Sequence, residues 1–274
     1  MNCFYFRLSF FYTKIVFVFV FFITLCGVEI SFAQPDSWIQ KSDMSTFGAA
    51  ARSRAVGITI GNYCYVGTGW DGTQNFPGWW RYDPASDTWA QMFDFTTEPI
   101  TPGTPRRECV AFSLGGFGYL GLGYDGSNTF QGLWQYDPVN NSWLNVASGS
   151  PRRGPVSFVI GNKAYVSTGY DQAISTYYKD LWEYNPPPSN TWTQKANIGG
   201  PVRFEAFGFS IGGYGYVGTG YDGSTYFSDF WQYNPQTNVW VQKANFPSAR
   251  HCASAFTLNR KGYVVGGESS GGPQ

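Results

Sequence analysis

Five arginines recur in one register along the sequence, each thirteen residues before a tyrosine. They are Arg52, Arg106, Arg152, Arg203 and Arg250, and they make up five of the eleven arginines in the chain. A guanidinium group binds carboxylate, sulfate or phosphate through parallel hydrogen bonds, and it pairs in the same way with aspartate or glutamate inside a protein. The register therefore predicts either an anion-binding surface or a lattice of ion pairs that joins repeated units.

Acidic and aromatic side chains accompany the arginines at repeated positions of their own. The aspartates are Asp71, Asp125, Asp171 and Asp222, and the loop aromatics are Phe76, Phe130, Tyr177, Tyr178, Tyr226 and Phe227. Further charges beside the arginine register are Arg54, Arg107, Arg153, Glu108 and Glu205. The aspartates are expected to pair with the arginines, and the rings either stack on a ligand or fold back over the edge of their own repeat. The predicted ligand-binding set is the five arginines, the four aspartates, Phe76, Phe130, Tyr177 and Tyr226.

Histidine content limits the metal and hydrolytic chemistry that the chain can perform. His251 is the only histidine, which excludes a His-rich zinc or iron centre, and a Ser-His-Asp triad could use no other residue. We expect His251 to be a polar residue at the start of a strand. The sequence predicts no metal and no cofactor.

The side chains above are placed by a repeat of about 50 residues. One slot reads Trp-x-Tyr-Asp/Asn-Pro, with its tyrosines at Tyr82, Tyr136, Tyr184 and Tyr233. A second tryptophan follows each copy, and a Gly-x-Gly-aromatic-Asp segment precedes it in most units. Each unit predicts four short strands separated by Gly, Asn-Pro or Asp-Pro turns. The expected units are 43–92, 93–146, 147–195 and 196–243, with a partial fifth at 244–274.

Composition supports an all-β fold and excludes two classes of partner. The chain has 34 glycines and 20% aromatic residues, which favours strands and turns over helices. Its 18 basic and 18 acidic side chains give a net charge of zero, so no electrostatic field draws the chain to nucleic acid or an anionic membrane.

The four antiparallel strands of one unit cannot bury both faces of their sheet alone. The units must therefore stack around an axis as the blades of a β-propeller.

These repeats resemble the kelch family over about residues 38–267. The Gly-rich end of the second strand, the Trp-x-Tyr-Asp-Pro segment and the later tryptophan lie at kelch spacing, although a true Gly-Gly pair occurs only at Gly266-Gly267. The resemblance implies a kelch-type β-propeller of four-stranded antiparallel blades, with function on the loops around the channel. Galactose oxidase is similar in fold, but its two histidine copper ligands are missing here. Bacterial sialate mutarotases are exported kelch propellers, and the resemblance implies a catalytic alternative with Arg203 and Glu205, or Arg107 and Glu108.

The first 33 residues are typical of a secretory signal peptide. Arg7 and Lys14 precede an apolar run of eleven residues, and Ser31-Phe32-Ala33 offers small residues for cleavage before Gln34. An uncleaved anchor is the alternative, but Glu29 would lie inside it. The mature chain is expected to be secreted, periplasmic or at the cell surface, and free of the membrane. Its three cysteines show no disulfide or zinc spacing and are expected to be small buried residues on strands.

The two ends of the repeat array leave the ring incomplete. Residues 36–42, with Trp38, offer one outer strand, and the fifth unit offers only two strands, so we expect four complete units and a truncated or incomplete chain. A strained five-blade ring and closure by a partner chain are the alternatives.

The predicted function is an exported, non-catalytic binding or scaffolding module for an acidic protein or glycan ligand. The alternative is a sialate mutarotase-like enzyme.

Overall fold

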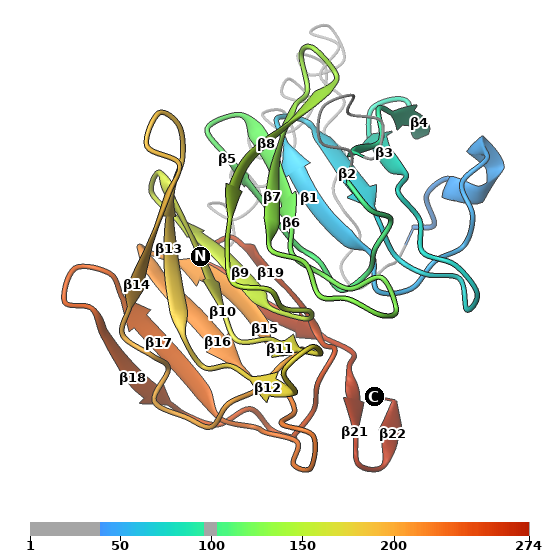
Figure 1. Ribbon diagram of the computed structural model, residues 1–274. Helices are drawn as coiled ribbons and strands as arrows, with labels where there is room; N and C mark the ends of the chain where they lie inside the picture. Colours follow the sequence, from blue (N-terminus) through green and yellow to red (C-terminus); the bar gives the residue numbers. More distant parts are fainter. Residues whose placement is uncertain (1–38, 96–102, 274) are drawn as a thin grey trace, which may run out of the picture. The chain divides into compact units, whose positions relative to one another are not determined.

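The computed structural model describes residues 39–95 and 103–273 (Figure 1). Ser42–Gln274 form one compact unit, which is described here by itself. Its regular structure is β-sheet, apart from one 3-10 helix, η1 (Met44–Phe47). The signal peptide at 1–33 and Trp38 lie outside the described residues, so both remain predictions. In the part of the chain that is described, no helix is long and apolar enough to cross a membrane.

Four sheets of four antiparallel strands make up most of the unit. Blade 1 contains β1 (Val56–Ile60), β2 (Tyr63–Gly67), β3 (Trp79–Asp83) and β4 (Thr88–Met92). Blade 2 contains β5 (Val110–Leu114), β6 (Phe117–Gly121), β7 (Gly132–Asp137) and β8 (Ser142–Ser148). Blade 3 contains β9 (Val156–Ile160), β10 (Lys163–Ser167), β13 (Leu181–Asn185) and β14 (Thr191–Lys195). Blade 4 contains β15 (Phe207–Ile211), β16 (Tyr214–Gly218), β17 (Phe230–Asn234) and β18 (Val239–Lys243).

Three hairpins complete the described strands. In blade 3, β11 (Tyr170–Asp171) pairs with β12 (Thr176–Tyr177) inside the loop between β10 and β13. The fifth unit has β19 (Ser254–Leu258) paired with β20 (Lys261–Val265), followed by β21 (Glu268–Ser269) and β22 (Gly272–Pro273). The sequence prediction of four full units and a two-stranded fifth agrees with these sheets.

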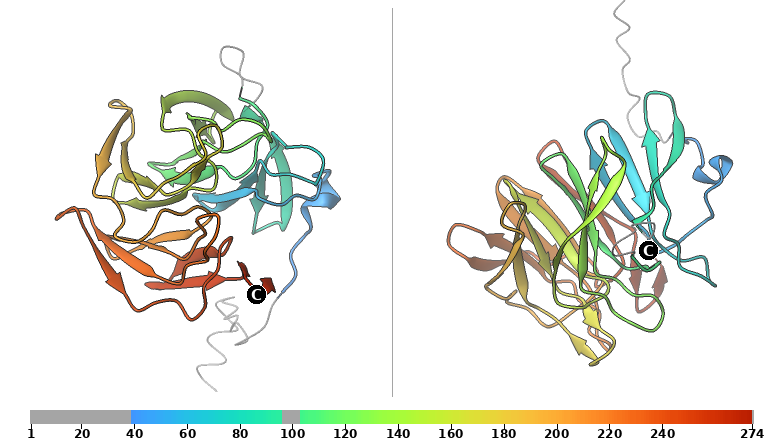
Figure 2. Two further views of the ribbon diagram at one scale, coloured as in Figure 1. Left: turned by 60° about the horizontal axis from the view of Figure 1, so that its bottom comes forward. Right: turned by 45° about the horizontal axis from the view of Figure 1, so that its top comes forward.

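The first strand of every unit lies nearest to a common axis. Strands β1, β5, β9, β15 and β19 contact one another in that order, so sequential blades are neighbours in space (Figure 2). Loops that precede the first strands are thereby gathered at one end of the axis. The expected all-β, propeller-type arrangement of antiparallel blades is confirmed.

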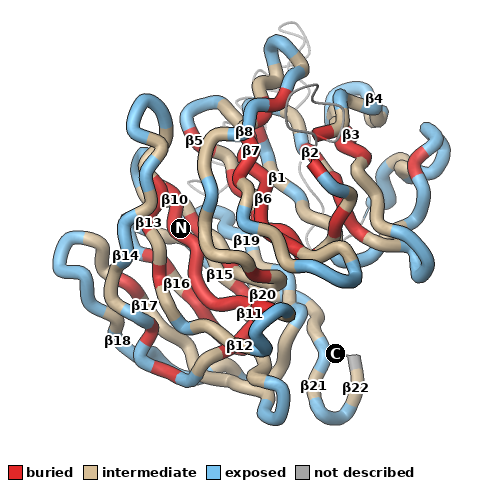
Figure 3. The backbone as a smooth tube through the Cα atoms, in the orientation of Figure 1, coloured by how far each residue is buried: buried red, intermediate tan, exposed pale blue. Residues whose placement is uncertain are grey.

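Buried residues lie along the strands of the blades (Figure 3), and the hydrophobic core clusters that they form join neighbouring blades. One cluster joins blades 1 and 2 through Tyr65, Trp79 and Tyr136, whose rings lie 5.6–5.8 Å apart. Two further clusters join blade 2 to blade 3 and blade 3 to blade 4. Because each blade covers the face of its neighbour, the repeated aromatic residues of the sequence stabilise the stack.

The repeated tyrosine of the Trp-x-Tyr slot anchors the turn between the third and fourth strands. In blade 4, the Tyr233 hydroxyl donates to Asn238 Oδ1 at 2.9 Å, and Asn238 adopts a left-handed φ of 55°. The same Asn238 oxygen accepts from the N–H of Ala196 in blade 3, and Trp240 Nε1 donates to the Ala196 carbonyl. The slot therefore has a structural role that links adjacent blades.

Candidate functional site

The five arginines in register form a structural belt. Each donates from Nη1 to the carbonyl sixteen residues later: Arg52 to Thr68, Arg106 to Leu122, Arg152 to Thr168, Arg203 to Thr219 and Arg250 to Gly266. The accepting residues all have left-handed φ between 57° and 68°. The sequence analysis placed the whole Gly-x-Gly stretch in the second strand, whereas β2, β6 and β16 end at its first glycine and the next residue turns. Each arginine therefore holds the turn of its own blade.

Two aspartates that the sequence analysis missed neutralise the belt in blades 3 and 4. Arg152 makes two hydrogen bonds to Asp180 at 2.6 and 2.9 Å, and Arg203 makes two to Asp229 at 2.5 and 2.6 Å. Burial acts to raise the pKa of Asp229, but the hydrogen bonds and charge of Arg203 outweigh it and hold that pKa below its usual value. The available signal was an aspartate two residues before the third-strand tryptophan, where blades 1 and 2 have glycine.

Three of the belt arginines are buried inside the fold. Arg106, Arg152 and Arg203 are 0–3% exposed, and backbone or aspartate oxygens occupy their guanidinium groups. A ligand would have to displace these contacts to reach them. Arg52 and Arg250 are half-buried and make the same backbone contact.

The four predicted aspartates close their own loops instead of pairing with the belt. Asp71 Oδ1 accepts from the N–H groups of Thr73 and Gln74 at 2.8 Å, and these bonds lower the pKa of Asp71 to about 2. Asp125 and Asp222 make the same turn, and Asp171 accepts from the Ala173 N–H and the Thr129 hydroxyl. The expected pairing with the belt arginines is therefore wrong, because local N–H groups satisfy these carboxylates first.

The loop aromatics divide into two groups. Phe76, Phe130, Tyr178 and Phe227 fold back, and their ring centres lie 4.6, 3.8, 4.2 and 4.8 Å from the guanidinium carbons of Arg52, Arg106, Arg152 and Arg203. Tyr177 and Tyr226 instead join a cluster near the axis, where Tyr177 packs on Tyr170 at 4.4 Å and Tyr226 packs on Tyr221 at 4.8 Å. Only the second group borders the polar cluster described next.

A ring of five residues, each two positions after a belt arginine, surrounds the axis. Its members are Arg54, Glu108, Gly154, Glu205 and Cys252, all with left-handed φ of 52–57°. The N–H of each of the last four members donates to the carbonyl of the member before it at 2.9–3.1 Å, so a chain of four backbone hydrogen bonds links the five units. We call this set the axial ring. This backbone hydrogen bonding fixes the positions from which the side chains of Arg54, Glu108, Glu205 and Cys252 extend.

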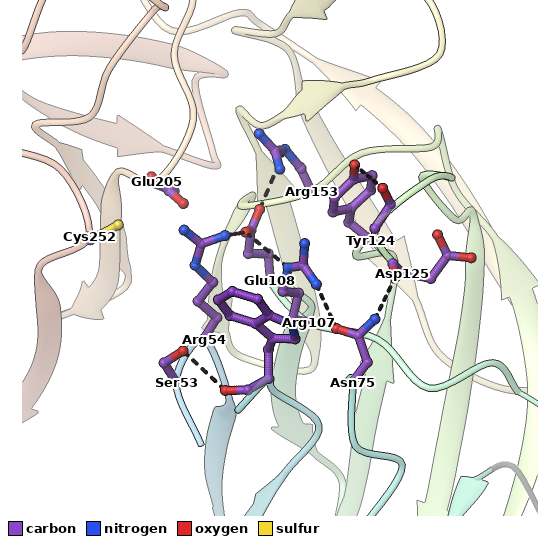
Figure 4. A network of polar contacts seen from close by, with 12 residues as sticks. Ser53, Arg54, Asn75, Arg107, Glu108, Tyr124, Asp125, Arg153, Glu205 and Cys252 are labelled. Atoms are coloured by element: carbon purple, nitrogen blue, oxygen red, sulfur yellow. Dashed lines mark hydrogen bonds and ion pairs between the residues drawn. The ribbon is translucent and has the colours of Figure 1, made fainter. Parts of the chain in front are cut away.

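Glu108 is the centre of a cationic cluster on this ring (Figure 4). Its carboxylate is 2.5 Å from Arg54 Nη1, 3.5 Å from Arg153 Nε and 3.8 Å from Arg107 Nε. The Glu108 side chain is 4% exposed, and burial raises its pKa although the three arginines oppose that shift. Three guanidinium groups thus share one buried carboxylate.

Arg153 has the most unused hydrogen-bonding capacity in the cluster. Within residues 39–95 and 103–273, its guanidinium donates no hydrogen bond, although its side chain is only 19% exposed. Aromatic rings surround it, with the centres of Tyr124 at 4.8 Å, Tyr170 at 5.5 Å and Phe204 at 5.6 Å. Arg107 differs, because it donates to Asn75 Oδ1 at 2.9 Å.

A second polar group lies across the ring from Arg107. His251 Nδ1 is 2.7 Å from Glu205 Oε2, and His251 Nε2 is 3.7 Å from Glu268 Oε2. The hydrogen bond to Glu205 raises the pKa of His251. Burial acts to raise the pKa of Glu205, but the bond and charge of His251 outweigh it, so that pKa is lowered. The pair is therefore favourable as a charged imidazolium–carboxylate contact.

An open pocket of about 260 Å³ adjoins the axial ring. Its walls are short stretches of the first strands and of the residues before them: Val56 and Gly57, Cys109 to Ala111, Pro155 to Ser157, Ala206 to Gly208, and Ala253 with Ala255. Each stretch begins one or two residues after a member of the axial ring. The charged cluster thus borders an open pocket that is lined mostly by small residues.

Of the four residues in the predicted catalytic alternative, the structure brings three to the axial ring and leaves one outside the site. Glu108, Arg107 and Glu205 belong to the polar site around the axial ring, but Arg203 is buried against Asp229 and makes no ion pair with Glu205 among the described contacts. Arg54 and Arg153, which the sequence analysis placed beside the main register, are central to the site. His251 also lies here, at the start of its unit and against Glu205.

Comparison with known proteins supports the family suggested by the repeats. A kelch motif matches residues 219–247, from the end of β16 through β18. No curated protein matches the sequence. A solved structure described as "Structure of YjhT" has a TM-score of 0.73 with 16% identity, over 88% of this chain and 83% of that one, which is a likeness of fold. The kelch motif in the fourth blade, this likeness of fold and the repeated four-stranded sheets together support a kelch-type β-propeller fold.

Proposed function

We propose that this protein is a binding module that takes an anionic ligand at the axial ring, through Arg54, Arg107 and Arg153. The observation that carries the proposal is the convergence of these three guanidinium groups on the single carboxylate of Glu108. Arginine stays charged at any physiological pH. A partly desolvated surplus of positive charge is stabilised by an incoming carboxylate, sulfate or phosphate.

The aromatic rings around Arg153 favour a carboxylate carried on a glycan or an acidic peptide. Tyr124, Tyr170 and Phe204 present flat surfaces beside the Arg153 guanidinium, and Tyr177 packs on Tyr170 and Phe204. Aromatic faces stack on sugar rings and on peptide side chains while an adjacent arginine holds the acid group. The ligand is thus an acidic glycan or protein segment, in keeping with the partner expected from the sequence.

Isothermal titration with defined acidic and neutral sugars tests this proposal. The probes are N-acetylneuraminic acid and glucuronic acid, with N-acetylmannosamine and glucose as neutral counterparts, and a short polyglutamate peptide for the protein alternative. Arg153→Gln removes the charge and should weaken binding of the acidic probe by about 10- to 100-fold, as expected for a hydrogen bond to a charged group. Arg260→Gln, on the exposed β19–β20 turn, is the matched control and should leave affinity unchanged. Equal affinity for acidic and neutral probes, or an unaffected Arg153→Gln variant, would overturn the proposal.

A second candidate function is proton transfer on a sugar, as in a mutarotase. The observation that favours it is Glu205, paired with His251 on the axial ring close to the arginines. In that reaction the ring C–O bond opens and closes again while a base moves the proton of the anomeric hydroxyl to the ring oxygen. Exchange of N-acetylneuraminate anomers, followed by NMR, should then be accelerated by the protein and not by Glu205→Gln. No acceleration at micromolar protein would exclude this candidate.

Export remains part of the proposal, because a secreted or surface location would give access to acidic glycans. The intact mass of the protein from its natural producer tests it. A mass that begins at Gln34 supports cleavage of the leader, and a retained leader would favour an anchored form.

A further inference from the structure

We propose that Glu205, His251 and Cys252 form a binding site for a zinc-type divalent cation. Nδ1 of His251 is 3.6 Å from Sγ of Cys252 and 2.7 Å from Oε2 of Glu205, and the three ligand atoms lie within 4.8 Å of one another. The residues come from the loops that lead into β15 and β19. The separation of 46 positions from Glu205 to His251 explains why no metal-binding spacing was visible in the sequence.

The distances suit tetrahedral coordination. With Zn–S near 2.3 Å and Zn–N near 2.0 Å, a tetrahedral angle separates the sulfur and nitrogen by about 3.5 Å. The observed separation is 3.6 Å. A carboxylate oxygen and an imidazole nitrogen on zinc lie about 3.3 Å apart, so the Glu205–His251 contact must open by roughly half an ångström. Three protein ligands leave the fourth position for water or a ligand oxygen.

The backbone holds these side chains in place before any cation binds. The N–H of Cys252 donates to the Glu205 carbonyl at 2.9 Å, and both residues have the left-handed φ of the axial ring. His251 is fixed by two backbone hydrogen bonds with Glu268, each 2.9 Å. Its Nε2 then lies 3.7 Å from the Glu268 carboxylate, the arrangement that orients a metal-binding imidazole and increases its basicity.

Charge around the site permits a cation despite the nearby arginines. Arg54, whose charge acts on Glu205 and His251, is itself paired with Glu108 at 2.5 Å. Glu205 and Glu268 add two further carboxylates. On binding, the Cys252 thiol proton and any proton on His251 Nδ1 pass to solvent, and the thiolate and imidazole donate to the metal.

The free cysteines of the chain differ in a way that supports a distinct role for Cys252. The sequence predicted small buried residues on strands, but within the described residues only Cys109 is buried, while Cys64 and Cys252 are exposed. Cys64 lies within strand β2. Cys252 lies in a loop, beside a histidine and a glutamate. Cys64 therefore serves as the matched control.

Titration of the metal-free full chain with Zn²⁺ and Co²⁺ tests the site. We expect one equivalent of Zn²⁺ by calorimetry, and with Co²⁺ a near-ultraviolet thiolate-to-cobalt charge-transfer band. Cys252→Ser should abolish that band, Cys64→Ser should retain it, and Glu268→Gln should weaken the affinity about 10- to 100-fold without loss of the fold. Arg153→Gln should bind the metal normally, which separates this test from that of the anion site.

Three results would overturn the proposal. The first is no stoichiometric uptake of either cation by the wild-type chain. The second is an equal loss of the cobalt band in Cys252→Ser and Cys64→Ser, which indicates nonspecific binding to thiols. The third is full affinity in both His251→Gln and Glu268→Gln, measured on samples whose circular dichroism and thermal melting match the wild type.

Discussion

Removing the Arg203 guanidinium should destabilise the fold strongly. Arg203 is 0% exposed and its two terminal nitrogens bind both oxygens of Asp229, while Nη1 also donates to the Thr219 carbonyl. Arg203→Met keeps much of the length and apolar volume of the side chain but removes the charge. It leaves Asp229 as a carboxylate without its cation, in a position where its side chain is only 15% exposed.

The expected cost follows from these contacts. Breaking a buried ion pair from one side costs about 3–5 kcal/mol, and the partial exposure of Asp229 favours the lower half of that range. The Thr219 carbonyl loses a hydrogen bond worth about 1 kcal/mol. A domain of this size loses roughly 2–4 °C in melting temperature per kcal/mol, so a total loss of about 4–5 kcal/mol should make the variant melt about 8–20 °C below the wild type.

Urea unfolding and thermal melting of a double-mutant cycle test this reasoning. Adding Asp229→Asn to Arg203→Met removes the negative charge that has lost its partner and should recover part of the lost stability. The interaction free energy between the two positions should be about 1.5 kcal/mol or more. Arg260→Gln on the exposed turn should change stability by less than about 0.5 kcal/mol. The structural role would be refuted if Arg203→Met cost less than about 1 kcal/mol, or if the two changes were simply additive.

Two further predictions concern packing and pH. Gly215→Ala would place a Cβ in overlap with the Phe158 ring of the neighbouring blade and should cost about 1–3 kcal/mol in urea unfolding, whereas Gly57→Ala meets no atom closer than 3.7 Å and should cost nothing. The raised pKa of His251 gives stability that is present below its ordinary value of 6.5 and is lost as pH rises through the raised value. The lowered pKa of Glu205 gives stability present above 4.5 and lost as pH falls through the lowered value. In buffer with chelator, the advantage of wild type over His251→Gln should therefore be largest between about pH 4.5 and 6.5 and near 1 kcal/mol; a pH-independent difference would contradict it.

The repeat was readable from sequence because its tyrosines and tryptophans serve the fold. Tyr233 and Trp240 each make a specific bond to a turn or to the next blade, so their spacing is set by strand length. The belt arginines were equally visible, since each holds a turn sixteen residues away within its own unit. Contacts inside one repeat, or between equivalent positions of adjacent repeats, leave a periodic signal in the sequence.

The partners of those arginines could not be read in the same way. Asp222 had the right period, but its carboxylate accepts N–H groups two and three residues ahead and is unavailable to Arg203. Asp229 occupies a position where blades 1 and 2 have glycine, so it carries no period. Local hydrogen bonds form at little entropic cost, and they take precedence over a more distant pairing that sequence spacing suggests.

The axial ring shows why the candidate site was hidden while its scaffold was not. Every member has left-handed φ, a conformation that glycine adopts freely and that costs other residues on the order of 1 kcal/mol or more. Gly154 shows that glycine meets the backbone requirement at this position. Arg54, Glu108, Glu205 and Cys252 nevertheless occupy the other four positions, held there by the continuous chain of backbone hydrogen bonds. Glycine or asparagine would adopt this conformation at lower cost, so we propose that these four side chains are present for what they bind. The strained backbone of the axial ring and the Arg153 N–H groups that donate no hydrogen bond therefore indicate the same cluster of charged residues. Both place the proposed chemistry at the axis rather than on the blade faces.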